Sequence, residues 1–371
     1  MTTPRPFVID VEQSTLDRID RKLADSRIGY APQDDRDWRY GTDASSLRAF
    51  VDHWRNDYDW RAQEAMLNRW PQALAEVDGV LLHFYHIPAP GGEAGRLPIL
   101  LMHGWPGSIV EFQAVIPLLL DAGYPLVVPS IPGFGWSGKP PRPLGEKAMA
   151  TLMRRLMVDV LGYPRFHAQG GDFGSLVATQ LGIWHADAVA ALHLNFYLPD
   201  GPGTSADPEL QAYWQQLASL TYPESGYLHQ QGTKPQTLAL ALHDNPLGWA
   251  AWTLEKFHGW SDWRSMGANG FQTDQLITNM MTYLVTDSVI SSIWMYHGSS
   301  HEQGKEGRVE APTAIARFPG EFYPLADRSL AARRYNIVRW TEMNAGGHFA
   351  AMEAPEAFAS DLIAFLDGQD C

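Results

Sequence analysis

The chain has 371 residues, of which 45% are hydrophobic and 12% aromatic, enough to bury one large core or two smaller ones. Its formal net charge of −14 at pH 7 argues against a general nucleic-acid binder and against an anionic membrane surface as partner, since both need a basic face. The single cysteine, Cys371, excludes a disulfide framework and a cysteine metal site. Because the N-terminal segment lacks an apolar signal core and no apolar run could span a bilayer, we expect a cytoplasmic protein without a membrane anchor.

The first part of the chain carries helical patterns. We find no strong strand signal before Gly79, and therefore predict an N-terminal helical region over residues 1–78. Its predicted helices cover residues 14–26, 45–56 and 60–68.

From Gly79 onward, short apolar runs alternate with helical stretches. Near-continuous apolar strands separated by helices are typical of a parallel α/β sheet with both faces covered. The predicted strands cover residues 79–85, 97–102, 125–129, 163–168, 188–194, 313–316 and 337–340. The sheet core would thus come from two parts of the chain, 79–198 and 306–371.

The stretch 199–305 interrupts this alternation. It begins with the turn-rich Pro199–Gly203, is then mostly helical, and holds many aromatic residues. An insertion of this size between two strands predicts a mainly helical lid over the carboxyl edge of the sheet.

The segment Gly170–Gly174, with the sequence GGDFG, has the small-x-nucleophile-x-small form of a nucleophile elbow. Asp172 stands where a serine is usual, between a predicted strand and a predicted helix over residues 175–186. A carboxylate attacks saturated carbon and forms an alkyl ester of the enzyme, which indicates ring opening or dehalogenation rather than ester hydrolysis. In the alternative interpretation Asp172 only caps the helix, and the motif alone does not separate the two.

Two later loops supply candidates for a base and an acid. His348 follows the last predicted strand and precedes the final helix, where a hydrolase base belongs in the order nucleophile, acid, histidine. The acid should follow the preceding strand, where Glu321 lies; Asp327 is the second candidate in the same connection. Its role would be to hold the imidazole tautomer and stabilise its charged form.

The loop His103–Ser108, with the sequence HGWPGS, follows an early predicted strand. In this kind of hydrolase that loop gives one of two backbone N–H groups that stabilise an oxyanion. We assign these donors to Trp105 and Phe173, each worth roughly 3 kcal/mol of barrier. With this loop, the nucleophile, acid and base candidates fall in the chain order of an α/β hydrolase.

Two other patterns are dismissed. Gly133–Gly138 matches a dinucleotide-binding fingerprint, but the proline-rich Lys139–Pro143 that follows cannot open a helix. His301 and Glu302 are not followed by a second histidine at the spacing zinc needs. We therefore expect neither an organic cofactor nor a metal.

Taken together, the chain resembles the microsomal-type epoxide hydrolases, including juvenile hormone epoxide hydrolases and their bacterial relatives. The resemblance covers nearly the whole chain, and we expect no counterpart of the family's N-terminal membrane anchor. The motifs that carry it are DYDWR at 57–61, LNRWP at 67–71, HGWPGS at 103–108, PSIPGFGWSG at 129–138, GGDFGS at 170–175 and GGHFAAMEAPE at 346–356.

The resemblance implies an α/β-hydrolase fold with a mostly parallel sheet, a helical lid and an N-terminal extension. It also implies that Glu321 is the charge-relay acid and that Tyr227 and Tyr296 are the ring-opening tyrosines. The sequence alone does not choose these two, because the lid region also holds Tyr213, Tyr222 and Tyr283.

The activity implied is hydrolysis of an apolar epoxide to a vicinal diol, through a hydroxyalkyl ester on Asp172, with water as the second substrate. The resemblance leaves a homodimer open. One alternative is a haloalkane dehalogenase, although Phe173 stands where a halide-binding tryptophan would be useful. Another is a catalytically silent ligand-binding protein on the same fold, against which the complete set of catalytic candidates counts.

Overall fold

The computed structural model describes residues 3–35, 37–89, 95–201, 207–263 and 271–369. Within these ranges nine strands form one sheet. They are β1 (Arg5–Phe7), β2 (Gln72–Val77), β3 (Val80–Ile87), β4 (Ile99–Met102), β5 (Leu126–Ser130), β6 (Phe166–Gly170), β7 (Val189–Leu194), β8 (Val309–Arg317) and β9 (Tyr335–Glu342). The strand order is β1-β2-β3-β5-β4-β6-β7-β8-β9. The pairs from β5 to β9 are parallel, whereas β1, β2 and β3 add an antiparallel edge.

The prediction of a purely helical region without a strong strand before Gly79 was wrong, since β1 and β2 both precede it. β2 pairs with β3 from Gln72 opposite Tyr85 to Val77 opposite Val80. The two residues between them, Asp78 and Gly79, have φ angles of 52° and 78°. An Asp-Gly pair with positive φ at both positions is a strong signal for a tight hairpin, so the sequence did contain this information.

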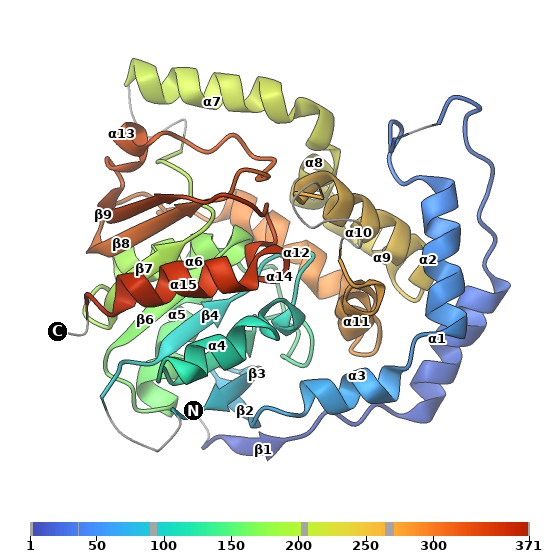
Figure 1. Ribbon diagram of the computed structural model, residues 1–371, viewed down its shortest axis with the longest axis horizontal. Helices are drawn as coiled ribbons and strands as arrows, with labels where there is room; N and C mark the ends of the chain where they lie inside the picture. Colours follow the sequence, from blue (N-terminus) through green and yellow to red (C-terminus); the bar gives the residue numbers. More distant parts are fainter. Residues whose placement is uncertain (1–2, 36, 90–94, 202–206, 264–270, 370–371) are drawn as a thin grey trace.

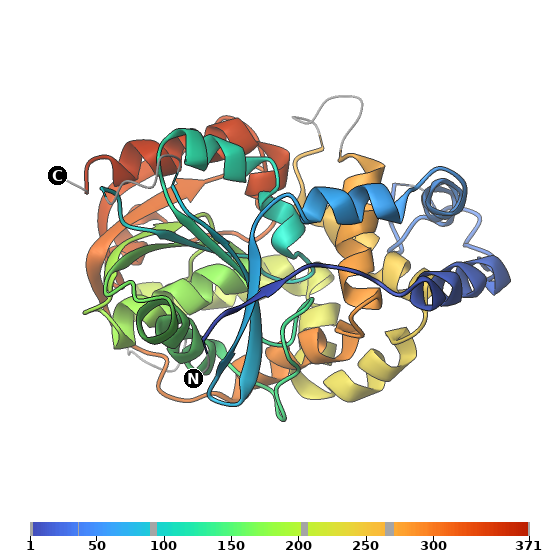
Figure 2. The same ribbon diagram turned by 90° about the horizontal axis from the view of Figure 1, so that it is seen from below.

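Helices cover both faces of the sheet (Figures 1 and 2). On one face α4 (Val115–Asp121) and α15 (Pro355–Leu366) pack against strand residues such as Leu101 and Val128. On the other face α5 (Glu146–Arg155) and α6 (Asp172–Trp184) pack against strand residues such as Leu100. Successive residues of a strand thus point into hydrophobic cores on opposite faces of the sheet. Both faces are buried, and the sequences of these strands are therefore continuously apolar.

The segment between β7 and β8 is helical, and we call helices α7 to α12 the lid. They are α7 (Pro208–Thr221), α8 (Gly226–Thr233), α9 (Pro235–Leu242), α10 (Pro246–Trp260), α11 (Thr273–Leu284) and α12 (Val289–His301). Most of the lid lies beside the sheet at the end where the parallel strands finish, whereas α7 extends from α8 along the side of the molecule that carries β9 (Figure 1).

The N-terminal helices lie beside the lid, at the end of the molecule opposite to β8 and β9 (Figure 1). They are α1 (Gln13–Asp25), α2 (Ala44–Asn56) and α3 (Trp60–Leu67), each within one residue of the sequence prediction. His53 Nε2 lies 2.7 Å from Asp274 Oδ1 of α11, and the Tyr58 hydroxyl lies 3.1 Å from Thr278 Oγ1. This region therefore supports the lid from the side away from the sheet.

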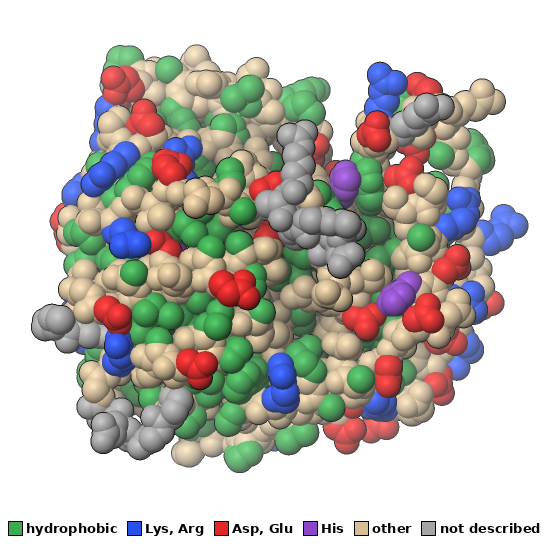
Figure 3. All heavy atoms as spheres, in the orientation of Figure 1, with side chains coloured by type: hydrophobic (Ala, Val, Ile, Leu, Met, Phe, Trp, Pro, Cys, Tyr) green, Lys and Arg blue, Asp and Glu red, His purple; other side chains and the backbone are tan. Residues whose placement is uncertain are grey.

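Where the structure describes the chain, it contains no helix that is both long and apolar enough to cross a bilayer. On the face seen in Figure 3, acidic and basic side chains are interspersed rather than separated by sign.

Candidate active site

Asp172 stands at a sharp turn between the central strand β6 and helix α6. Its φ is 46°, a backbone conformation that is strained for any residue with a side chain and typical of functional turns. A Cβ on Gly174 would overlap the Met102 carbonyl oxygen, and one on Gly170 would overlap the backbone of Gly174. The glycines are therefore what lets the turn form, as an elbow requires.

The helix-cap interpretation of Asp172 was wrong. The N-cap of α6 is Gly171, and Asp172 is the first residue inside the helix, where it makes no side-chain cap. Its carboxylate instead points to the loop after β4. Oδ1 accepts a hydrogen bond of 2.8 Å from the Trp105 backbone N–H, and a Cβ on Gly104 would overlap the same oxygen.

Phe173 follows directly in the first turn of α6, where backbone N–H groups lack partners inside the helix. In the described part of the chain its N–H makes no hydrogen bond to the Asp172 carboxylate, so of the two predicted N–H donors only Trp105 bonds that group in this state. Both predicted N–H donors nevertheless lie beside Asp172, one from each neighbouring segment.

His348 joins two carboxylates. Its Nδ1 lies 2.8 Å from Glu321 Oε2, and its Nε2 lies 3.3 Å from Asp172 Oδ2. Glu321 follows β8 and His348 follows β9, so the carboxyl ends of three parallel strands bring the three side chains together. Asp327, the second candidate for the acid, instead accepts a 2.9 Å hydrogen bond from the Leu330 N–H and caps α13 (Arg328–Ala331).

The charge state of His348 follows from this position. Burial lowers its pKa, but the nearby carboxylates of Glu321 and Asp172 outweigh burial and hold the pKa well above its ordinary value. The resting site therefore favours an imidazolium between two carboxylates.

The lid contributes Tyr227 from α8 and Tyr296 from α12, both buried. The Tyr227 ring stacks on Trp105 at 5.8 Å between centroids, and Tyr296 meets the same ring edge-on at 5.5 Å. Tyr296 also packs edge-on against Phe173 at 4.8 Å. Burial, together with the charge of Asp172, raises the pKa of each hydroxyl well above 10, so both remain proton donors.

The hydroxyls of the other lid tyrosines either bond backbone carbonyls or are exposed to solvent. The Tyr283 hydroxyl donates to the Gly107 carbonyl, the Tyr213 hydroxyl donates to the Pro324 carbonyl at 3.2 Å, and Tyr222 is exposed. The tertiary structure thus separates Tyr227 and Tyr296 from their competitors.

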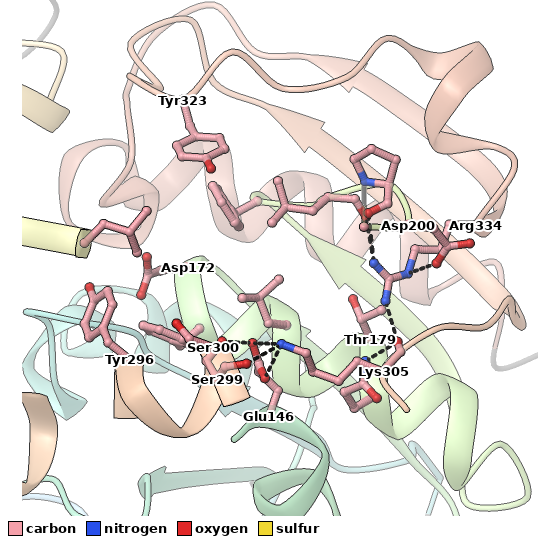
Figure 4. Close-up of a pocket in the computed structure, with 18 of the residues that line it drawn as sticks. Glu146, Asp172, Thr179, Asp200, Tyr296, Ser299, Ser300, Lys305, Tyr323 and Arg334 are labelled. Atoms are coloured by element: carbon pink, nitrogen blue, oxygen red, sulfur yellow. Dashed lines mark hydrogen bonds and ion pairs between the residues drawn. The ribbon is translucent and has the colours of Figure 1, made fainter. Parts of the chain in front are cut away.

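These residues surround a cavity of about 320 Å³. Figure 4 shows Asp172 beside Tyr296 at one end, with Arg334 and Lys305 toward the other. Near Asp172 the lining is mostly apolar and includes Phe173, Leu176, Phe196, Leu228 and Phe322. The sequence analysis missed Tyr323, which also lines the cavity and donates its backbone N–H to Glu321 Oε1 at 3.1 Å.

Two further acids adjoin the site and were missed by sequence. Half-buried Glu111, in the short helix after the Trp105 loop, borders a void of about 10 Å³ that Asp172 and His348 also line, enough for one water molecule. Burial, opposed by His348, raises the pKa of Glu111 to about 8. Glu353 accepts hydrogen bonds from the N–H groups of Asp262 and Phe349, at 2.7 and 2.8 Å, and so ties the His348 loop to the lid.

No group of three or more His, Cys, Asp or Glu side chains is placed to hold a metal ion within the described ranges. A carboxylate, a histidine and buried phenols line one cavity, an arrangement suited to acid–base chemistry.

Residues 4–112 match the family model for the epoxide hydrolase N terminus, and residues 98–244 match that of the alpha/beta hydrolase fold. Juvenile hormone epoxide hydrolase 1 of Ctenocephalides felis is 34% identical, over 97% of this chain and 84% of the relative. The chain belongs to the epoxide hydrolase family.

Other epoxide hydrolases support the same assignment. Epoxide hydrolase 1 of Sus scrofa is 32% identical, over 98% of this chain and 88% of that protein. The solved structure of Aspergillus niger epoxide hydrolase aligns with a TM-score of 0.87 at 29% identity, over 99% of this chain and 97% of that one. The resemblance and the α/β-hydrolase fold inferred from the sequence are thus confirmed.

Proposed function

We propose that this epoxide hydrolase converts an apolar epoxide to a vicinal diol in two steps, through a covalent ester on Asp172. The observation that carries the proposal is the placement of the Asp172 carboxylate. One oxygen accepts the Trp105 N–H at 2.8 Å, the other lies 3.3 Å from His348 Nε2, and Asp172 lines the same cavity as His348, Tyr227 and Tyr296.

In the first step Asp172 Oδ2 attacks one ring carbon, and the carbon–oxygen bond of the epoxide breaks. Tyr227 and Tyr296 hydrogen-bond the epoxide oxygen, and one of them gives it a proton as negative charge develops. The apolar surroundings of Asp172 suit this step, because they exclude water that would otherwise solvate the carboxylate.

Ester formation prepares the second step. It removes the negative charge of Asp172, which is one of the two charges that raise the pKa of His348. The pKa of the imidazole then falls, so His348 releases its proton to solvent and acts as a base in the intermediate; it takes a proton up from solvent again once the Asp172 carboxylate is restored.

In the second step His348 takes a proton from water, and the water oxygen attacks the Asp172 carbonyl carbon. The Trp105 and Phe173 N–H groups stabilise the oxyanion, worth roughly 3 kcal/mol each. As the ester bond breaks, one proton of the water passes through His348 to the departing diol oxygen. The other proton of the water returns the tyrosinate left by the first step to its neutral phenol form, and Asp172 is again a carboxylate.

The alternatives predict different products. A haloalkane dehalogenase would need N–H donors for the departing halide, whereas the residue beside Asp172 is Phe173 and phenols face the cavity. A silent ligand-binding protein would bind an epoxide without forming a diol. Family membership and the tyrosine pair favour the epoxide.

The test is a single turnover of a styrene oxide-type substrate in heavy-oxygen water, followed by peptide mass spectrometry. We expect label in the Asp172 carboxylate, because water attacks its carbonyl carbon, and an unlabelled diol. Label found only in the diol would overturn the covalent route. Asp172→Ala, the control, should form neither diol nor labelled peptide.

A further inference from the structure

Tyr323 brings a third phenol to the cavity, besides Tyr227 and Tyr296. It lies in the loop after β8, two residues beyond Glu321, and lines the cavity together with Asp172. Figure 4 shows its ring entering the cavity with the hydroxyl end directed inward, while Asp172 and Tyr296 lie on the other side. Neither step of the proposed hydrolysis uses this hydroxyl.

Aromatic neighbours hold the Tyr323 ring in place. Phe196 packs edge-on against it at 5.4 Å between centroids, and Phe322 lies nearly perpendicular to it at 5.7 Å. Phe322 is itself stacked on Trp260 of the lid at 4.6 Å. The Tyr323 backbone N–H donates to Glu321 Oε1 at 3.1 Å, which anchors the main chain. The hydroxyl is therefore presented from a fixed position, on a ring with apolar side chains around it.

The Tyr323 hydroxyl is open and unpaired. It makes no hydrogen bond with any of the described residues, and it is not one of the polar atoms that the fold encloses without a partner. Because the side chain is half-buried and lines the cavity, the hydroxyl is accessible from there. The hydroxyls of Tyr197, Tyr213 and Tyr335, by contrast, each donate to a backbone carbonyl. Tyr323 is therefore free to bond a ligand.

The chemistry of this phenol selects its partner. Burial, together with the charges of Glu321 and Asp172, raises the pKa of the Tyr323 hydroxyl to about 12, so it keeps its proton at neutral pH and can donate it to an acceptor. The same two carboxylates would repel an anionic substituent. A cationic substituent would pair with Asp172 and block the nucleophile. A neutral oxygen acceptor fits best.

Substrate binding makes this hydroxyl a determinant of specificity. A substrate that fills the cavity removes the hydroxyl from water, and a buried donor that is left unpaired weakens binding, typically by about tenfold. An all-carbon epoxide incurs this loss, whereas an epoxide with a suitably placed oxygen avoids it. The distance between the two groups is short, because Phe196 packs edge-on against both Tyr323 and His348, at 5.4 and 5.9 Å. The phenol is thus one aromatic ring away from the catalytic base.

We propose that the substrate carries a neutral acceptor oxygen, as an ether, ester or hydroxyl, within a few bonds of the epoxide ring, and that the Tyr323 hydroxyl donates a hydrogen bond to it. The inference rests on the proposed function and narrows its substrate class from apolar epoxides in general to oxygen-bearing ones.

The test measures kcat/KM for matched epoxides, an ether and the hydrocarbon in which CH₂ replaces the oxygen. Benzyl glycidyl ether and 5-phenyl-1,2-epoxypentane form one such pair, and two further pairs place the oxygen one and two carbons farther from the ring. The ether-to-hydrocarbon ratio of the wild type is divided by that of Tyr323→Phe, which cancels the intrinsic reactivity of each epoxide. We expect a quotient of about ten for at least one pair. A quotient near one for every pair would overturn the proposal.

Tyr323→Phe keeps the ring and the backbone bond to Glu321 and removes only the hydroxyl. The matched control is Tyr213→Phe, since the Tyr213 hydroxyl bonds the Pro324 carbonyl and lies outside the cavity lining; its ratio should equal that of the wild type. If Tyr323→Phe loses activity equally on ether and hydrocarbon, the hydroxyl does not select the substrate and the proposal is wrong.

A binding measurement separates this proposal from the proposed function. In Asp172→Ala, which cannot form the ester, calorimetry compares the unreacted ether and hydrocarbon of each pair. A preference for the ether that is about tenfold greater than in the double variant with Tyr323→Phe supports the Tyr323 site, even if no ester on Asp172 is ever trapped. The same preference in both variants overturns it, even if turnover through Asp172 is demonstrated.

Discussion

The Trp105 backbone N–H donates to Asp172 Oδ1 at 2.8 Å, which leaves Oδ2 as the oxygen nearer to His348. The two oxygens of one carboxylate are thereby distinguished before any substrate binds. In the proposed route Oδ1 becomes the carbonyl oxygen of the ester and Oδ2 forms the new bond to carbon. The donor that orients the nucleophile is then also the one that stabilises the oxyanion.

Replacing His348 by glutamine should trap the ester. Without a base, alkylation of Asp172 proceeds but hydrolysis does not. Intact-protein mass spectrometry should therefore show an increase equal to one substrate. The double variant with Asp172→Ala should show no increase, and the same negative result in the single variant with bound substrate would contradict the role of His348.

Glu321→Gln should slow ester hydrolysis by a factor on the order of 10²–10⁴. The carboxylate raises the pKa of His348, so its removal should also shift the pH dependence of the hydrolysis step to lower pH. Rapid-mixing kinetics across pH measure both effects. Asp327→Asn is the control, because Asp327 caps α13 and does not contact His348; an equal loss in that variant would count against the assignment.

Tyr227→Phe and Tyr296→Phe should each slow alkylation, by roughly 10²-fold, because a proton donor to the epoxide oxygen is lost. The double variant should form almost no ester, measured as the initial rate of Asp172 adduct formation. Tyr213→Phe removes a hydroxyl that bonds the Pro324 carbonyl and should alkylate at the wild-type rate. If single variants keep that rate, the tyrosines are not the ring-opening acids.

Glu111 should make stability depend on pH. Its pKa is raised to about 8 in the folded protein against a usual value of 4.5, so the unfolded state ionises first. This costs stability as pH rises from about 4.5 to about 8. The melting temperature of Glu111→Gln relative to wild type should therefore increase over that range. Glu356→Gln, at an exposed position, should show no such trend; a flat difference for Glu111→Gln would refute the explanation.

The elbow should not tolerate a side chain at Gly174. An added Cβ would overlap the Met102 carbonyl oxygen, so Gly174→Ala should lower the melting temperature by more than about 5 °C or prevent folding. At Gly29 nothing lies within 4 Å of an added Cβ, and Gly29→Ala should melt close to wild type. Thermal unfolding followed by circular dichroism measures both.

Some of this architecture was readable from sequence because it depends on local chemistry. Glycines around Asp172 are needed by the backbone of one turn, and apolar runs report strands buried on both faces. The β2–β3 hairpin shows the limit of such reading. Its Asp-Gly turn is a local signal, but β2 is held as a strand by pairing with β3.

The sequence by itself therefore determined the family, the sheet with its helical insertion, and the order of Asp172, Glu321 and His348. Only the tertiary structure placed Glu321 rather than Asp327 beside His348, and Tyr227 and Tyr296 rather than Tyr283 along the cavity at Asp172. The reason is physical. Hydrophobic periodicity and turn chemistry act over a few residues, whereas these relationships join strand ends and lid helices that are far apart in the chain, and only packing sets the distances between them.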